Sequence, residues 1–124
     1  MTKGQIEAKL SEAISKFEIE VMGRGPKQIR TFILQDLIVV RLNGFLSPSE
    51  RKLAESNQGV ELLKKLRTTL FENARNDLEV LVKTVTNTDI ISIHSDVSTR
   101  IGENIIVFTV GENLEDKLKA KLGD

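Results

Sequence analysis

The sequence predicts an α+β fold in which a four-stranded antiparallel sheet, built from two β-hairpins, is covered by helices on one face. The chain has 124 residues and is 40% hydrophobic, which fits one domain over residues 1–124 with a single modest core. Periodicity and turn residues give the element order α-β-β-α-α-β-β-α. Because an isolated hairpin is barely stable in water, we expect the two hairpins to join into one sheet of a two-layer sandwich.

The first element is a helix that begins near Lys3. Thr2 and Gln5 form a capping-box pattern, in which the threonine caps the helix start and the glutamine reaches back. An apolar stripe of helical period follows, formed by Ile6, Leu10, Ala13, Ile14, Phe17 and Val21. The helix is predicted to pack this stripe on the core and to end at residues 23–26, where glycine and proline stop it.

A β-hairpin is predicted to follow this helix. Residues 29–34 and 37–42 are two runs rich in Ile, Val and Phe, separated by Gln35 and Asp36 at the length of a tight turn. Gln-Asp is not a strong pair for the primed turns of hairpins. The sequence therefore leaves the strand register open by one residue.

Two helical segments come next. The pattern Ser-Pro-Ser-Glu at residues 47–50 combines a serine cap with a proline at the first helical position, and the short helix should run to about Glu55. A second start near Asn57 opens a segment with apolar residues at helical spacing to about residue 85. Unbroken, it would extend roughly 40 Å, so residues 73–77, which include poor helix formers, are the expected place of a bend.

The second predicted hairpin consists of residues 89–97 and 104–110, joined by a polar loop that contains a glycine. Asn113 then caps a final helix over residues 114–122, which ends at Gly123. In both hairpins neighbouring residues are apolar, so both faces of the sheet are expected to be apolar. We therefore predict a homodimer that covers the sheet face without helices.

Composition excludes several classes of protein. The chain has no cysteine, which rules out disulfides, thiolate catalysis and cysteine-held metals. Eighteen basic residues balance eighteen acidic ones, and five phenylalanines are the whole aromatic content, so binding to nucleic acid is not expected. No apolar run approaches the roughly 20 residues of a membrane-spanning helix. We expect a soluble, cytoplasmic protein.

A polar row marks the third predicted strand. Because side chains alternate along a strand, Ser92, His94, Asp96 and Ser98 should share one face, while Ile91, Ile93 and Val97 share the other. Residues two apart on a strand lie about 6.6 Å apart along its axis, too far for a Ser-His-Asp relay. His94 is the only histidine, so no metal site is predicted. A solvated face and a polar binding site, in which His94 could sense pH, both stay open.

The loop after the first helix carries cations next to glycines. Glycine and proline at residues 23–26 are ordinary helix stops, but they do not account for the cations at positions 24, 27 and 30. Flexible backbone beside guanidinium groups suits a phosphate or carboxylate, although no nucleotide-binding fingerprint is present. The candidate ligand-binding residues are Arg24, Gly25, Lys27, Arg30, Arg41, His94, Asp96 and Ser98.

Three segments carry a family resemblance that covers nearly the whole chain. They are residues 23–31, residues 40–54 with the helix start at Ser47, and residues 93–109 with the polar row. In these segments the chain resembles the MpsC family of small bacterial proteins, named for a Na⁺-translocating membrane-potential-generating system. The resemblance implies an accessory or regulatory protein of a membrane system for cation or inorganic-carbon transport, at the inner face of the cell membrane.

The same resemblance transfers no catalytic residues and no cofactor, because the family has none established. The chain is therefore expected to be an accessory protein rather than an enzyme. An alternative stays open: a domain that binds a small anion or nucleotide through the loop at Arg24 and acts on it with His94 and Asp96.

Overall fold

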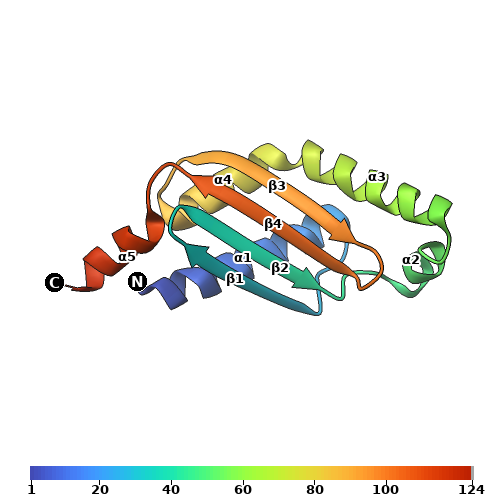
Figure 1. The fold of residues 1–124 in the computed structure, drawn as a ribbon, viewed down its shortest axis with the longest axis horizontal. Coiled ribbons are helices and arrows are strands. Elements are labelled where there is room, and N and C mark those ends of the chain that lie inside the picture. Colours follow the sequence, from blue (N-terminus) through green and yellow to red (C-terminus); the bar gives the residue numbers. More distant parts are fainter. Residues whose placement is uncertain (124) are drawn as a thin grey trace.

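The computed structural model describes the backbone of residues 1–123 and the side chains of residues 1–119. The elements are α1 (Lys3–Met22), β1 (Gln28–Leu34), β2 (Leu37–Asn43), α2 (Pro48–Leu53), α3 (Asn57–Asn73), α4 (Arg75–Thr86), β3 (Ile90–Ser98), β4 (Glu103–Val110) and α5 (Leu114–Gly123). The strands form one open antiparallel sheet, and α1 and α4 lie behind it (Figure 1). The predicted α+β class and element order are confirmed.

Helix α1 has both ends that the sequence predicts. The Thr2 side chain accepts a hydrogen bond from the backbone N–H of Gln5, and the Gln5 side chain accepts one from the N–H of Thr2. At the other end Gly23 takes a φ of 79°, a left-handed conformation that costs glycine little. Its apolar stripe packs against β1 and α4 and carries Leu10 and Ile14 into the core.

The strand order of the sheet is β1-β2-β4-β3, so the two hairpins meet where β2 pairs with β4. In the first hairpin Leu34 pairs with Leu37, which leaves a two-residue turn and no slip of register. Gln35 takes a φ of 57°, in the range that primed turns need at this position. The start of α5 holds this turn, because the Gln35 backbone exchanges hydrogen bonds with Glu115.

The long helical segment divides into α3 and α4 at Ala74, inside the stretch where the sequence predicts a bend. Helix α3 projects past the end of the sheet together with α2 (Figure 1). A glycine is needed where these two helices meet, because a Cβ at Gly59 would lie 1.6 Å from the carbonyl oxygen of Leu53. The Ser56 side chain caps α3 by accepting from the backbone N–H of this glycine.

One hydrophobic core lies between the sheet and the helices. Its fully buried residues come from every layer and include Leu10, Ile33, Ile38, Leu78 and Phe108. A smaller cluster joins Leu63 of α3 to Phe45 and Leu46, which follow β2. Arg67 of α3 contacts this second cluster, because its guanidinium lies 4.0 Å from the centre of the Phe45 ring.

One sequence prediction about β3 is wrong. Ile91 was expected to share the apolar face of Ile93, but the pairing of β3 with β4 shifts register between Ile90 and Ser92. Ile91 is the extra residue of this irregularity and is 65% exposed, while Ile93 is buried. A bulge leaves its additional residue outside the regular alternation, which hydrophobic patterning alone does not reveal.

Candidate functional site

The sheet has a face that no described helix covers, which we call the open face. Alternation and register place on it Gln28, Arg30, Phe32 and Leu34 of β1, Leu37, Val39, Arg41 and Asn43 of β2, Glu103, Ile105, Val107 and Thr109 of β4, and Ser92, His94, Asp96 and Ser98 of β3. The four residues of the predicted polar row therefore share one face, as expected. They form one edge of a larger surface.

The centre of the open face is apolar. One row across the sheet runs through Phe32, Val39 and Val107 and ends at His94. Leu34 and Leu37 extend the apolar surface toward the hairpin turn. Phe32 is 37% and Leu34 52% exposed in the single chain. The expectation that both sheet faces carry apolar residues is thus met.

The next row of the open face is charged at both of its ends. Arg30 pairs with Arg41, which neighbours Ile105, and this isoleucine pairs in turn with Asp96. Arg41 forms a 2.8 Å ion pair with Glu103, and the Arg30 guanidinium lies 5.4 Å from the centre of the Phe32 ring. The β1 edge of this row is therefore cationic and the β3 edge anionic.

The loop at Arg24 joins the end of α1 to the start of β1. Arg24 and Lys27 are exposed, and the backbone N–H of Lys27 donates to the carbonyl oxygen of Asn43 at the β1–β2 end. Gly25 packs on α1, where an added Cβ would lie 3.0 Å from Ile19. His94 lies on β3, the edge strand opposite β1. Met22, two residues before Arg24, lines one cleft together with His94. A ligand-binding role for these residues stays a prediction.

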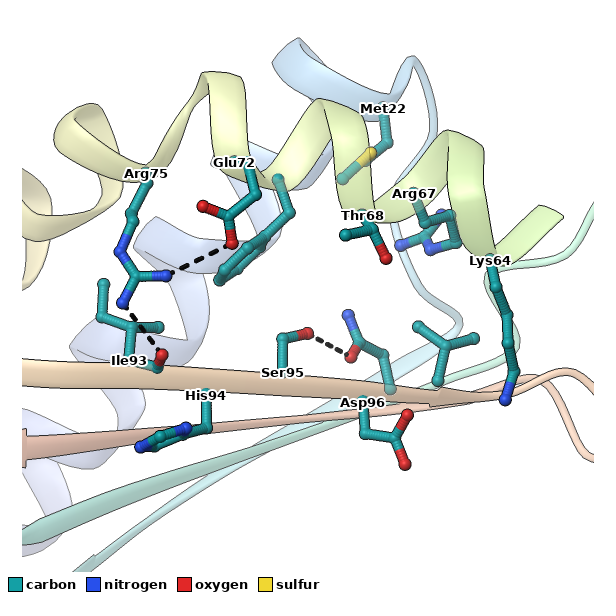
Figure 2. Close-up of a pocket in the computed structure, with 13 residues that line it drawn as sticks. Met22, Lys64, Arg67, Thr68, Glu72, Arg75, Ile93, His94, Ser95 and Asp96 are labelled. Carbon is teal, nitrogen blue, oxygen red and sulfur yellow. Dashed lines mark hydrogen bonds and ion pairs between the residues drawn. The ribbon is translucent and has the colours of Figure 1, made fainter. Parts of the chain in front are cut away.

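A second surface lies on the helix side of β3, in a cleft of about 270 Å³ that we call the α3 cleft. Helix α3 supplies one wall through Lys64, Arg67, Thr68, Phe71 and Glu72. The strands supply the other through residues 93–97 of β3, which include His94 and Asp96 of the predicted polar row, and through Asn104 of β4. Figure 2 shows the Ser95 side chain directed toward α3, whereas the His94 and Asp96 side chains point away from it.

The base of the α3 cleft contains a buried ion pair. Arg67 Nη2 donates to Glu18 Oε1 over 3.0 Å, and the side chains are only 7% and 2% exposed. The guanidinium also lies 4.0 Å from the centre of the Phe45 ring, a cation–π contact shielded from water. Burial raises the pKa of the Glu18 carboxyl, and the nearby Arg67 charge opposes this only in part.

Two further groups of the α3 cleft are already paired. Arg75 donates to the carbonyl oxygen of Ile93 over 3.0 Å and lies 3.4 Å from the Glu72 carboxylate (Figure 2). On the opposite wall Ser95 Oγ donates to Asn104 Oδ1 over 3.0 Å. In contrast, Arg67 Nε is the one buried side-chain nitrogen or oxygen of the described residues without a hydrogen-bond partner.

The sequence analysis missed Glu18 and Arg67, although a signal was present. Glu18 follows Ile14 by four residues, so it lies on the apolar stripe of α1. Arg67 lies midway between the buried Leu63 and Phe71 of α3. Opposite charges at core positions of two helices indicate a buried pair, because a single charge there would be too costly.

The described residues contain no group of three or more metal-binding side chains placed to hold an ion. Among the same residues, no helix has the length and apolar character needed to cross a bilayer.

Comparisons with known proteins agree on one family. The family model described as Na⁺-translocating membrane potential-generating system (MpsC) matches residues 2–112. Uncharacterized protein YbcI of Bacillus subtilis (strain 168) is 35% identical over 118 residues, which cover 95% of each chain. Uncharacterized protein YrhF of the same strain is 26% identical over 113 residues, covering 89% of this chain and 91% of the relative. No solved structure matches the chain.

Proposed function

We propose that this chain, which belongs to the MpsC family, is a non-catalytic accessory protein of a cation-transporting membrane system and acts as a homodimer joined through its open face. The observation that carries the proposal is the apolar surface on the side of the sheet without helices. The link to a membrane system rests on the description of the family.

The open face has the character of an interface. Phe32, Leu34, Leu37, Val39 and Val107 adjoin one another, whereas isolated apolar residues are the normal state of a protein surface. An antiparallel sheet exposed to water on one side usually has a polar outer face, whereas the centre of this open face is apolar. A second sheet stacked on it at about 10 Å would bury this surface in the way a β-sandwich does.

The charged row favours a second copy of the chain as the occupant. A two-fold axis parallel to the strands keeps each row opposite the same row of the other copy and reverses the strand order. Arg30 of one copy then lies opposite Asp96 of the other, so the cationic and anionic edges meet. The apolar row meets itself, with Val39 opposite Val107.

Light scattering after size-exclusion chromatography tests the dimer. The wild-type chain of 13.9 kDa should elute at twice this mass, whereas Val107→Lys, which places an ammonium in the apolar row, should elute as a folded monomer. Val80→Lys is the matched control, because Val80 is 65% exposed on α4 and lies outside the open face. A monomeric wild-type protein, or a dimer that survives Val107→Lys, would contradict the proposal.

A charge exchange tests the orientation. Arg30→Asp and Asp96→Arg should each weaken the dimer because they oppose like charges, and the double variant should restore it. Sedimentation equilibrium measures the three dissociation constants. Additive weakening in the double variant would reject the two-fold axis along the strands.

The cellular role is tested separately by deleting the gene and measuring sodium efflux from sodium-loaded cells. Efflux should fall on deletion and recover with wild type and Val80→Lys, but not with Val107→Lys. Efflux that does not change on deletion would reject the role in cation transport and would leave the dimer standing.

A further inference from the structure

We propose that the α3 cleft binds a small organic anion, with its carboxylate or phosphate group at Lys64, Thr68 and Arg67 and a short apolar body against Phe71 and Val97. This site lies on the helix side of β3. His94 and Asp96 border it, but Figure 2 shows their side chains pointing away from α3, and the proposed contacts do not use them. The site therefore stands or falls independently of the dimer.

The charges in the α3 cleft leave one cation without a partner. Arg75 is paired with Glu72, and Arg67 with Glu18, within the described residues. Lys64 makes no ion pair with any described residue and extends from α3 across the cleft toward β3 (Figure 2). The Asp96 carboxylate, which could neutralise it, points out of the cleft. Lys64 is thus the cation of the cleft that has no ion-pair partner among the described residues.

The uncharged polar groups of the α3 cleft also offer donors. Asn104 is 3% exposed, and its Oδ1 already accepts from Ser95, so its Nδ2 is the group left to donate. Arg67 Nε is buried without a partner, while Nη2 and the ring face hold the guanidinium in place. An unpaired buried donor such as Arg67 Nε is rare in folded proteins, and an incoming acceptor would satisfy it. A ligand can reach Arg67 Nε only if side chains that line the cleft move. Met22 is one of these side chains, and methionine is unbranched and adaptable.

The apolar residues that line the α3 cleft determine the size and character of the apolar part of the ligand. Phe71, Ile93 and Val97 present apolar surface beside the polar groups, a combination typical of organic ligands rather than of bare ions. The volume of about 270 Å³ lies just below the range of about 300–1,000 Å³ for drug-sized ligands. A short-chain acid or a small phosphate monoester matches this space.

Chemical-shift titration of the ¹⁵N-labelled full chain tests the site with four probes: butyrate, butyl phosphate, inorganic phosphate and butylammonium. Butyrate or butyl phosphate should shift the amides of Thr68, Ser95 and Asn104 in a saturable way. Inorganic phosphate should bind at least about fivefold more weakly, because it lacks the apolar body. Which of the two organic anions binds more tightly identifies the head group.

Lys64→Gln should weaken that binding at least about fivefold, since it removes the unpaired charge. Lys65→Gln is the matched control, because Lys65 is exposed on the same helix and does not line the cleft. No saturable shift up to about 50 mM of either organic anion would overturn the site. Preferential binding of butylammonium, or equal binding by Lys64→Gln and the wild type, would also overturn it.

Discussion

The polar row of β3 and the Glu18–Arg67 pair are two sets of ionisable residues with opposite surroundings. His94 and Asp96 lie exposed on an edge strand, where water competes with any partner. Glu18 and Arg67 lie between α1 and α3 with almost no contact with water. The charges of the buried pair interact more strongly than those of the exposed row, because burial rather than residue type sets the strength of a charge interaction. The polar pattern that is visible in the sequence is therefore not the site of the strongest electrostatic interaction.

Removing one member of the buried pair is the largest expected effect. Glu18→Leu leaves the Arg67 guanidinium buried without its counter-charge, and the free energy of unfolding should fall by about 3–5 kcal/mol. Urea unfolding measures this loss. Asp96→Leu on the open face is the matched exposed change. At a protein concentration at which both chains are monomers, it should alter stability by no more than about 0.5 kcal/mol.

The double variant Glu18→Leu with Arg67→Met separates the lost pair from lost packing. It should recover most of the stability, because an apolar pair of similar volume carries no desolvation penalty. A double variant as unstable as Glu18→Leu alone would show that the ion pair itself stabilises the fold. The buried pair would then differ from the exposed β3 row in its net contribution to stability as well as in its burial.

The two arginine–phenylalanine contacts give a second, smaller test of the same contrast. Phe45→Leu removes the ring 4.0 Å from the buried Arg67 guanidinium and should cost about 2 kcal/mol. Phe32→Leu removes the ring 5.4 Å from Arg30 on the open face and should cost about 0.5 kcal/mol. Urea unfolding of both variants, at concentrations that give them the same oligomeric state, decides the matter. Equal losses would mean that burial does not strengthen this contact.

The fold could be predicted from the sequence because its signals are local. The capping residues Thr2 and Ser47 and the left-handed Gly23 act within a few residues of themselves. The α3 cleft could not be predicted, since it depends on the angle at which α3 leaves Ala74 and passes over β3. The bulge at Ile91 could not be predicted for a related reason. It is defined by the pairing of β3 with β4 and has no signature in the neighbouring residues.

The candidate site shows the same limit. His94 attracted attention as the only histidine, and its placement on one face with Asp96 followed correctly from strand alternation. How near it lies to Arg24 depends on the path of the loop between α1 and β1 and on the strand order β1-β2-β4-β3, which no local pattern encodes. Sequence patterns thus located faces of elements, whereas the bringing together of elements required the structure.

The smallest expected effect is a difference in pH dependence. Burial raises the pKa of Glu18 above its ordinary value of 4.5 in the folded protein, despite the opposing Arg67 charge. The folded state then holds this proton more tightly than the unfolded state does. The contribution of Glu18 to stability is therefore full below pH 4.5 and declines as the pH rises from 4.5 through the raised pKa.

Glu18→Gln, which cannot ionise, isolates this contribution. Asp89 and Glu115 accept hydrogen bonds from Lys83 and Lys3, which lower the pKa values of both carboxyls. Their contribution to the stability of the protein is therefore lost as the pH falls, the opposite of the Glu18 contribution. Both terms are common to wild type and variant, so they cancel in the difference between two urea-unfolding series. As the pH rises above 4.5, the stability of the wild type should fall relative to that of Glu18→Gln. A difference that instead favours the wild type with rising pH would mean that the Arg67 charge outweighs burial, and the buried pair would then be a source of stability at neutral pH.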